Sequence, residues 1–313
     1  ARVMDYSHPQ KFTVTSEDGN WHKEYSVIID TFDLPLRYDF EHYELNETGK
    51  YQVFFEETQG TALFKQYIWA SGNSGFALTG VGRNPQEYPT VSIENGIDGS
   101  RAIKLETKST GQFGETVKMP IAAGNLFLGS FDVNNAVQKP LKATRFGLPF
   151  GKKPLQLKGY YKYTPGTQPF KAKDKNGNTV TIPGQEDEGD IYAVLYEAAE
   201  LDGQALDGNN VLTSKNIVAL ARVEVEKKDE FTAFHVDFHY ESRIPIDWPK
   251  FIQDQRDPSD DGTDEYLPFK EEKMKNYEYN LAVVFTSSKY GAYFAGSVGS
   301  TLCIDKVEIV CEK

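Results

Sequence analysis

Residues 145–163 read Arg145-Phe-Gly-Leu-Pro-Phe-Gly-Lys-Lys-Pro-Leu-Gln-Leu-Lys-Gly-Tyr-Tyr-Lys-Tyr163, and residues 289–309 read Lys289-Tyr-Gly-Ala-Tyr-Phe-Ala-Gly-Ser-Val-Gly-Ser-Thr-Leu-Cys-Ile-Asp-Lys-Val-Glu-Ile309. In both, Gly or Pro residues lead into a run of apolar, aromatic and β-branched residues. Runs of this kind, bounded by turn-forming residues, are typical of β-strands. We therefore expect both stretches to belong to a β-sandwich, and neither contains an enzyme signature.

The rest of the chain repeats this pattern. Its 313 residues include 26 Gly and 15 Pro, and long helical periodicities are almost absent from the sequence. Val, Ile, Thr, Tyr and Phe, which favour strands, are abundant. Strands are expected at residues 100–107, 155–164, 190–197, 217–226, 231–241, 277–287 and 300–310. Such strands, joined by long loops, predict an all-β, two-sheet jelly-roll sandwich over residues 32–313.

Residues 10–30 predict a separate hairpin. The first strand alternates polar and apolar residues, and Glu17-Asp18-Gly19-Asn20 forms the turn. An isolated hairpin is marginally stable in water. The segment resembles the last two strands of immunoglobulin-like modules of secreted bacterial proteins. We therefore expect residues 1–31 to be the C-terminal strands of an immunoglobulin-like β domain, whose earlier strands are missing from this chain.

The charge of the chain restricts its partners. Lys and Arg number 34 and Asp and Glu number 46, which gives a formal net charge of −12. A nucleic-acid-binding protein needs a basic stripe, and the sequence shows none, so we expect no nucleic-acid partner. An acidic surface is compatible with neutral glycans or divalent cations. The sequence has no apolar run of transmembrane length and no signal peptide.

The two cysteines, Cys303 and Cys311, lie in one predicted strand. At about 3.3 Å per residue they are roughly 26 Å apart, which is beyond the reach of a disulfide. We therefore expect two free thiols, and the cysteine content does not decide the cellular compartment.

The predicted strand 231–241 has two chemically different faces. Its core-facing positions are Phe234, Val236, Phe238 and Tyr240, and its other face carries His235, Asp237, His239 and Glu241. Because His235 and His239 would be roughly 13 Å apart, at most two of His235, Asp237 and His239 can share a metal ion. The face is otherwise interpreted as a water-facing polar surface, or as one that hydrogen-bonds sugar hydroxyls.

Aromatic residues are candidate stacking platforms for sugar rings. The candidates are Trp69, Tyr88, Tyr160, Tyr161, Tyr163 and Trp248. Tyr160 and Tyr161 point to opposite faces of a strand, so at least one of them is expected in the core. Trp248 lies between Asp247 and Pro249 in a long loop, and we expect it to be the most exposed of the set. For any single aromatic residue, burial is the more common outcome.

Catalytic residues are harder to choose. Glycoside hydrolysis requires two carboxylates about 5–9 Å apart, and Glu197, Asp237 and Glu241 are guesses among many acidic residues. The sequence lacks a Gly-x-Ser-x-Gly elbow, a P-loop and a dinucleotide fingerprint. Loops of functional length lie at residues 106–130, 165–189 and 245–275. The acidic run at 257–265 lacks the spacing of a calcium loop, so we interpret it as solvated.

Five phrases of the chain are specific: Trp69-Ala-Ser-Gly-Asn-Ser-Gly-Phe-Ala, Leu105-Glu-Thr-Lys-Ser-Thr-Gly, Ile121-Ala-Ala-Gly-Asn-Leu-Phe-Leu-Gly, Arg145-Phe-Gly-Leu-Pro-Phe and Gly159-Tyr-Tyr-Lys-Tyr. With these phrases, residues 32–313 resemble a bacterial surface family, the putative carbohydrate metabolism domain. The resemblance implies a secreted or lipid-anchored surface protein of a Gram-negative gut bacterium, in which an immunoglobulin-like domain precedes a jelly roll similar to carbohydrate-binding modules. The family has no settled catalytic residues, so none are carried over.

A second resemblance concerns a structural calcium. Phe40-Glu41 at the first strand and Gly299-Ser-Thr-Leu-Cys-Ile-Asp305 at the last are similar to the strand ends of jelly-roll carbohydrate-binding modules. In many such modules a calcium ion lies where these strands meet, so the resemblance implies Glu41 and Asp305 as ligands. Here Lys306 stands where a second acidic residue is frequent. The alternative is that Asp305 caps a bulge and Glu41 is solvated.

These observations favour non-catalytic glycan binding in a surface polysaccharide-capture system. The predicted binding residues are Trp248, Trp69, Tyr88, Tyr161, His235, Asp237 and His239. The alternatives are a glycoside hydrolase that uses a carboxylate pair, and a structural or adhesive surface protein; fold class alone does not separate them. We expect a monomer that contacts the membrane only through an anchor absent from this chain.

Overall fold

A computed structural model describes residues 10–27, 33–58, 64–198, 201 and 204–312. The chain divides into two compact units, Ala1–Leu34 and Pro35–Lys313. The described part of the first unit is the antiparallel hairpin of β1 (Gln10–Thr15) and β2 (His22–Val27), as the sequence predicts. Asp18 stabilises its turn by accepting hydrogen bonds from the hydroxyl of Ser16 and the amide of Asn20. That the hairpin belongs to an immunoglobulin-like module stays a prediction.

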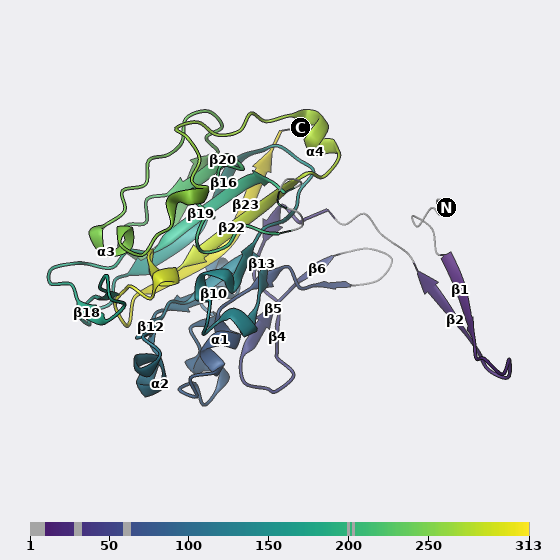
Figure 1. Ribbon diagram of the computed structural model, residues 1–313, viewed down its shortest axis with the longest axis horizontal. Coiled ribbons are helices and arrows are strands. Elements are labelled where there is room, and N and C mark those ends of the chain that lie inside the picture. Colours follow the sequence, from purple (N-terminus) through teal and green to yellow (C-terminus); the bar gives the residue numbers. More distant parts are fainter. Residues whose placement is uncertain (1–9, 28–32, 59–63, 199–200, 202–203, 313) are drawn as a thin grey trace. The chain divides into compact units, whose positions relative to one another are not determined.

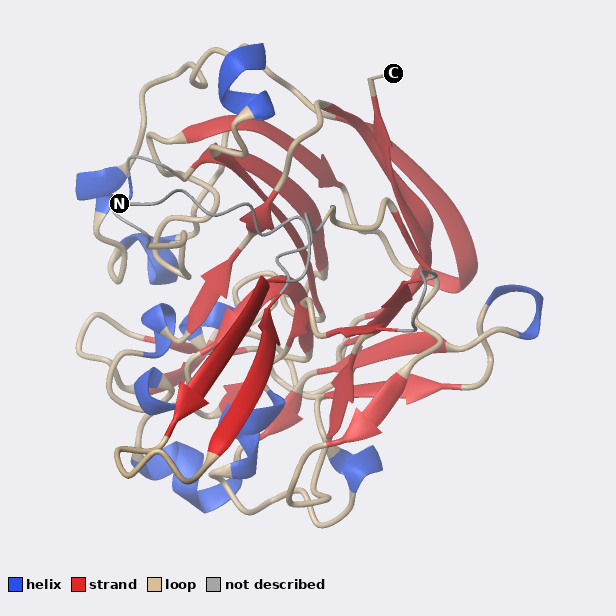
Figure 2. Ribbon diagram, turned by 90° about the vertical axis from the view of Figure 1, so that its right-hand side faces the viewer, coloured by secondary structure: helices blue, strands red, loops and turns tan. Residues whose placement is uncertain are grey.

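The second unit contains two antiparallel sheets, drawn in Figures 1 and 2. The six-stranded sheet has the order β21 (Lys228–Asp237), β16 (Pro154–Thr164), β23 (Thr301–Cys311), β10 (Ala102–Glu106) and β9 (Thr90–Ile93), with β3 (Arg37–Tyr38) also paired to β23. The seven-stranded sheet has the order β14 (Thr144–Phe146), β13 (Asn125–Phe131), β22 (Tyr279–Thr286), β19 (Asp190–Glu197) and β20 (Ile217–Val223); β15 (Leu148–Pro149) also pairs with β22, and β8 (Trp69–Ala70) with β13.

Aromatic side chains join the two sheets. Tyr38 of β3 meets Trp69 of β8 edge to face at 5.0 Å, and Trp69 lies 6.1 Å from Phe285 of β22. Phe40, which follows β3, contacts both Trp69 and Phe285. Tyr38 belongs to the six-stranded sheet and Phe40 follows it, whereas Trp69 and Phe285 belong to the seven-stranded sheet, so the core lies between the sheets. The predicted all-β jelly-roll sandwich is therefore confirmed.

Strand β16 shows why this sequence forms a sandwich. Leu157, Gly159, Tyr161 and Tyr163 are buried, whereas the residues between them are only partly buried. This alternation is the period-two pattern that places every second side chain in the core. A close backbone approach makes Gly159 necessary, because a β-carbon there would lie 2.9 Å from the ring of Phe234.

Strand boundaries differ from the predicted ones mainly at β20 and β21. Strand β20 ends at Val223, not at 226, and β21 runs from Lys228 to Asp237, not from 231 to 241. The chain leaves the six-stranded sheet after Asp237, because His239 exchanges two backbone hydrogen bonds with Leu220 of β20. The chain thus crosses from one sheet to the edge of the other at this point.

The remaining elements are short. Four two-stranded ribbons consist of β4 (Tyr43–Leu45) and β5 (Gln52–Phe54), β6 (Glu56–Thr58) and β7 (Phe64–Gln66), β11 (Lys108–Ser109) and β12 (Ile121–Ala122), and β17 (Lys171–Lys173) and β18 (Thr179–Thr181). The helices are α1 (Asn73–Ala77), α2 (Gly111–Thr116), α3 (Lys250–Gln253) and α4 (Glu271–Lys275), with 3-10 turns η1 (Pro85–Glu87), η2 (Ile97–Gly99), η3 (Val133–Asn135), η4 (Pro140–Lys142), η6 (Pro258–Asp260) and η7 (Gly291–Tyr293). No helix among the described residues is long and apolar enough to span a membrane.

A small second core holds the long loops together. Phe170, Ala172, Ile252, Tyr293 and Ala295 are buried against one another, and they come from three loops that are far apart in the sequence. The β17–β18 ribbon and α3 lie at the same end of the sandwich in Figure 1. The loops predicted at 165–189 and 245–275 are therefore packed against the segment that precedes β23.

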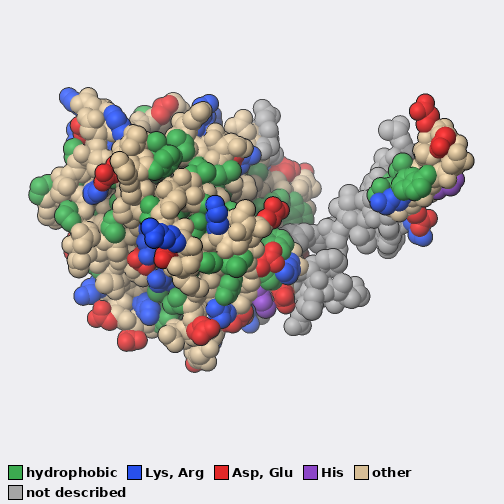
Figure 3. Space-filling model, turned by 90° about the horizontal axis from the view of Figure 1, so that it is seen from below, with side chains coloured by type: hydrophobic (Ala, Val, Ile, Leu, Met, Phe, Trp, Pro, Cys, Tyr) green, Lys and Arg blue, Asp and Glu red, His purple; other side chains and the backbone are tan. Residues whose placement is uncertain are grey.

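Both cysteines are free thiols, as the sequence predicts. Cys303 is buried in β23, and its burial raises the pKa of the thiol to about 11. The surface of the sandwich carries charges of both signs. On the face in Figure 3, Lys and Arg side chains are interspersed with Asp and Glu and form no single basic patch.

Candidate functional site

A cavity of about 190 Å³ lies against the outer face of the seven-stranded sheet. Because Phe285 points into the inter-sheet core, its neighbours Val284 and Thr286 point the other way and line the cavity. Phe113 and Ala292, which are exposed, also line it, so the cavity opens to solvent at that end. We call this cavity and its lining the groove.

The floor of the groove consists of two rows of cross-strand neighbours. In the first row, Phe127 of β13 pairs with Val284 of β22, which pairs with Tyr192 of β19. All three are buried and belong to one apolar cluster with Phe146. Phe127 and Phe146 meet edge to face, with ring centroids 4.8 Å apart. The first row therefore offers an apolar, partly aromatic surface.

The second row is polar. Asn125 of β13 pairs with Thr286 of β22, which pairs with Asp190 of β19. The side-chain carbonyl of Asn125 accepts a hydrogen bond from the amide of Gly72 at 2.8 Å, which fixes the orientation of its side chain. The hydroxyl of Thr286 donates to the carbonyl of Ser288 at 3.1 Å, and its oxygen lone pairs can still accept.

Asp190 is neutralised within the protein. Its carboxylate accepts hydrogen bonds from Nε of Arg222 at 3.0 Å and from a terminal nitrogen of the same guanidinium at 2.7 Å. Both side chains are largely buried, with 4% of Asp190 and 13% of Arg222 exposed. This two-point geometry is the strong form of a carboxylate–guanidinium pair. The salt bridge holds Asp190 in place at the edge of the floor.

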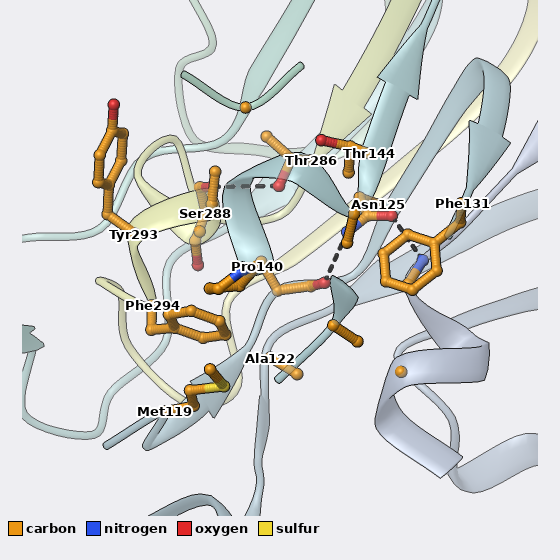
Figure 4. A pocket seen from close by; sticks show the side chains of 18 of the residues that line it. Met119, Ala122, Asn125, Phe131, Pro140, Thr144, Thr286, Ser288, Tyr293 and Phe294 are labelled. Atoms are coloured by element: carbon orange, nitrogen blue, oxygen red, sulfur yellow. Dashed lines mark hydrogen bonds between the residues drawn. The ribbon is translucent and has the colours of Figure 1, made fainter. Parts of the chain in front are cut away.

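One wall of the groove comes from the end of β13 and the opposite wall from the segment around η7, as Figure 4 shows. Phe131 lies on one side with Asn125, and Tyr293 and Phe294 lie on the other. Close approach of the η7 turn requires Gly291, because a β-carbon there would lie 2.3 Å from that of Ala123. The sequence Tyr290-Gly-Ala-Tyr293, near the start of the stretch 289–309, thus brings one wall against the floor.

Trp248 is the one predicted binding residue that lines the groove. It is partly buried, and the guanidinium carbon of Arg256 lies 4.5 Å from its ring centroid. Arg256 is held in turn by both carboxylate oxygens of Asp261, at 2.7 and 2.8 Å. Tyr290 and Tyr293 pack against the indole, each with ring centroids 6.4 Å away. These contacts fix the orientation of the indole at the groove.

A buried carboxylate anchors the loop that forms this wall. One oxygen of Asp187 accepts hydrogen bonds from the hydroxyl of Ser288 at 2.6 Å, the amide of Ser297 at 2.8 Å and the hydroxyl of Ser300 at 2.7 Å. Burial raises the pKa of the Asp187 carboxyl to about 6, although these three hydrogen bonds lower it. Asp187 therefore ties the acidic loop 185–189 to the segment 288–300.

A second, smaller pocket of about 110 Å³ lies where the same loops meet. Its lining includes three carboxylates, Glu186, Glu188 and Asp247, beside the ring of Tyr290. Glu188 is paired with the ammonium of Lys289 at 2.7 Å, and Lys289 also lines the groove. The acidic pocket and the groove are thus neighbours along the segment 289–290.

Four of the six candidate aromatic platforms are in the core. Trp69 is 4% exposed, Tyr88 1% and Tyr161 4%, so none presents a free ring face, and Tyr163 is buried as well. Trp69 donates its indole N–H to the buried carboxylate of Glu56 at 2.8 Å. The prediction that Trp69, Tyr88 and Tyr161 are stacking platforms is therefore not supported; burial, the more common outcome for an aromatic residue, holds for all three. Tyr160, on the opposite face of β16, is partly exposed.

The predicted polar stripe lies on the other sheet. His235, Asp237 and His239 are exposed, and Asp237 accepts a hydrogen bond from the side-chain amide of Gln156 at 2.6 Å. The first two belong to β21, the edge strand of the six-stranded sheet. The stripe is therefore separate from the groove, and its role in binding stays a prediction.

The guessed catalytic carboxylates do not line the groove either. Glu197 is buried in β19, and its carboxylate accepts a hydrogen bond from the ammonium of Lys273 at 2.6 Å. Asp237 and Glu241 are exposed. Glu197 therefore acts as one half of a buried ion pair.

Glu41 and Asp305 both hold the loop 96–101. Asp305 accepts hydrogen bonds from the amide of Ile97 at 2.7 Å and the hydroxyl of Ser100 at 2.8 Å, and Glu41 accepts one from the amide of Arg101 at 3.0 Å. These neighbours are donors, which fit a carboxylate better than they fit a cation. No group of three metal-ligating side chains occurs among the described residues. Calcium at this position stays a prediction, which calcium titration followed by thermal unfolding checks.

Sequence reasoning missed most of the groove. The floor residues Asn125, Phe127 and Thr286 gave no catalytic or binding motif. A signal was nevertheless present, because the alternation in Asn125-Leu-Phe-Leu places Asn125 and Phe127 on one strand face. That this face is covered by loops follows only from the fold.

Comparison with known proteins identifies the family. The model of the putative carbohydrate metabolism domain matches residues 39–310. A solved structure described as a putative glycoside hydrolase from Bacteroides thetaiotaomicron is 42% identical, with a TM-score of 0.73, and the match covers 99% of this chain and 80% of that one. A second solved structure with the same description, from Bacteroides vulgatus, is 35% identical, with a TM-score of 0.71. The match covers 90% of this chain and 100% of that one.

No curated protein sequence matches the chain. The family match spans both sheets and the residues that form the groove, and the two solved structures share the fold at substantial identity. The chain therefore belongs to the putative carbohydrate metabolism domain family.

Proposed function

We propose that this protein binds carbohydrate without cleaving it, and that the groove on the seven-stranded sheet is the binding site. The observation that carries the proposal is the floor, in which an apolar row of Phe127, Val284 and Tyr192 lies beside a polar row of Asn125, Thr286 and Asp190. A sugar ring likewise has apolar C–H faces and a polar rim of hydroxyls. Recognition of such a ligand needs apolar contact together with a few fixed polar groups.

Trp248 and the polar row make different contacts with the ligand: the indole stacks on a sugar ring, and the polar row accepts hydrogen bonds from its hydroxyls. The indole of Trp248, held by Arg256 and Tyr293, supplies a preoriented aromatic surface at the groove. Thr286 and Asp190 retain lone pairs beyond their internal hydrogen bonds, so they accept hydrogen bonds from sugar hydroxyls. Preoriented groups lower the entropy lost on binding, which favours affinity.

The small number of carboxylates in the groove favours binding over hydrolysis. Hydrolysis of a glycosidic bond needs two carboxyl groups on opposite sides of that bond. Among the described residues that line the groove, Asp190 is the one carboxylate, and Arg222 already contacts both of its oxygens. Without a second carboxylate across the groove, Asp190 does not form the acid and base pair that hydrolysis needs.

Glycoside hydrolysis is the second candidate. The acidic pocket with Glu186, Glu188 and Asp247 favours it, since it places three carboxylates beside the groove. Both solved relatives are described as putative glycoside hydrolases, which is consistent with this candidate. If it holds, the groove binds the substrate and the acidic pocket supplies the acid and the base.

One experiment separates the two functions. The protein is run in affinity gels that contain individual polysaccharides, and new reducing ends are measured in parallel solutions. Retardation without new reducing ends, abolished by Trp248→Ala, is the expected result. New reducing ends that disappear in Glu186→Gln or Asp247→Asn would instead establish hydrolysis. Asp237→Asn, on the opposite sheet, is the matched control for both.

The proposal includes a location at the cell surface, as the family resemblance implies. Cell fractionation and surface proteolysis of the source bacterium test it. Recovery of the protein from the outer-membrane fraction, with loss after protease treatment of whole cells, is expected. Recovery from the cytosolic fraction would contradict this part of the proposal and leave the binding chemistry untouched.

A further inference from the structure

The chemistry of the groove is unusual for a site that binds an unsubstituted sugar. Its inner part is formed by Phe127, Phe146, Val284, Tyr192 and Val211, all buried members of one apolar cluster. A sugar ring buried there would lose hydrogen bonds from its hydroxyl rim to water, and each unpaired hydroxyl would cost free energy. The inner groove therefore suits a ligand group that has no hydroxyl rim.

The polar side chains of Asn125 and Ser288, in and next to the polar row, are largely engaged within the protein. Asn125 contacts the amide of Gly72 and the carbonyl of Ala123 through its two side-chain ends. The hydroxyl of Ser288 is bonded to Asp187 and Thr107. These groups lie along one side of the floor, in the polar row and next to it. Asn125 and Ser288 therefore have few hydrogen-bonding positions left for a buried sugar.

The size of the groove matches an aromatic ring. A closed apolar cavity of about 150 Å³ lined by aliphatic and aromatic residues accommodates benzene, and the groove measures about 190 Å³. Phe131 on one wall and Phe294 on the other are partly exposed to this space. Rings placed in this way offer edge and face contacts to an aromatic ring between them.

We propose that the groove binds an aryl-substituted carbohydrate, such as an aryl glycoside or an aromatic ester of a sugar. The aryl group occupies the apolar row between Phe131 and Phe294, and the sugar lies beside the polar row, near Thr286 and Asp190. This inference rests on the proposed function and adds to it the class of substituent that the ligand carries.

The test compares matched pairs of ligands on the full chain. Phenyl and methyl β-glycosides of glucose, galactose and xylose are compared by saturation-transfer NMR and by titration calorimetry. For at least one sugar, the phenyl glycoside is expected to bind about tenfold or more tightly than its methyl partner. Its aryl protons should receive more saturation than its sugar protons.

Filling variants locate the aryl group. Ala136 and Ala292 line the groove without belonging to the main core, so Ala136→Phe and Ala292→Phe reduce its volume while preserving the fold. Both variants should lose the preference for the phenyl glycoside. Ala233→Phe, an exposed position on β21, should keep it. Unchanged thermal unfolding of the variants serves as the folding control.

The outcomes separate this inference from the function on which it rests. Equal binding of phenyl and methyl glycosides, abolished by Trp248→Ala, overturns the aryl site and leaves glycan binding intact. Binding of 2-phenylethanol as tight as that of every phenyl glycoside supports the aryl site and overturns carbohydrate recognition. An aryl preference that survives both filling variants, or no binding of any phenyl glycoside, overturns the aryl site.

Discussion

The outer faces of the two sheets share one core and differ in almost everything else. The face of the six-stranded sheet presents His235 and Asp237 to solvent, whereas the face of the seven-stranded sheet is buried beneath loops and holds Asp190 in a salt bridge with Arg222. In both sheets, side chains along a strand point alternately to the outer face and into the core. The two faces differ because the long loops fold over the seven-stranded sheet. Polar residues on that sheet therefore line a groove, whereas those on the six-stranded sheet face solvent.

The largest expected difference between the faces is in stability. Arg222→Met leaves Asp190 as an uncompensated charge in a buried position, so we expect the free energy of unfolding to fall by about 3 kcal/mol or more. Lys158→Met, on the outer face of β16, should change it by less than about 0.5 kcal/mol. Urea denaturation of both variants measures the difference. Equal losses would show that Asp190 is hydrated, and would remove the distinction between the faces.

The next effect depends on pH. The pKa of Asp187 is raised by burial to about 6, above the value of about 3.9 for an exposed aspartate. The folded wild type therefore favours the protonated carboxyl and loses stability as the pH rises from about 4 to about 6. Asp187→Asn has no such charge, so its stability relative to wild type should rise over this range, by about 3 kcal/mol at most.

The control for the pH effect is on the other face. Ala233→Ser, at an exposed position on β21, should show a difference from wild type that is constant, within about 0.5 kcal/mol, between about pH 4 and about pH 7. Thermal and urea unfolding at several pH values provide the measurement. If the Asp187→Asn difference is also independent of pH, the three serine hydrogen bonds outweigh burial and the direction given above is wrong.

A smaller effect concerns the ligand. Trp248→Ala should weaken binding of a retained glycan about tenfold, because an aromatic contact is worth about 0.5–1.5 kcal/mol beyond the area that it buries, and about 1.4 kcal/mol corresponds to tenfold in affinity. Trp248→Phe should recover part of the affinity, since a smaller ring keeps the stacking surface. Both are compared by affinity electrophoresis. Loss of binding in Trp248→Ala together with a lower unfolding temperature would mean that the indole supports the loops instead.

The smallest effect is expected on the open face. His235→Ala and His239→Ala should change glycan affinity by less than about twofold and stability by less than about 0.5 kcal/mol. This prediction tests the sequence-based interpretation of the stripe directly. A loss of affinity in either variant, with wild-type affinity in Trp248→Ala, would move the binding site to the six-stranded sheet.

The sequence predicted the fold better than the site for a physical reason. Strand β19 was predicted with its correct limits, 190–197, because a run of strand-forming residues reports burial locally. Trp69 was misplaced because a large aromatic ring is equally able to fill a core or to face a ligand. Gly72, Asn125 and Ser288 meet at the groove only through tertiary packing, which no local pattern records.

The division of the groove between sheet and loops has an evolutionary consequence. Changes at floor residues such as Tyr192 disturb the sheet, so selection for folding restricts them. Exposed lining residues outside both sheets, such as Phe113 of α2 and Ala292 of η7, form the rim of the groove, where substitutions are tolerated. Under the proposed function, substitutions at this rim would alter ligand preference while the floor stays unchanged.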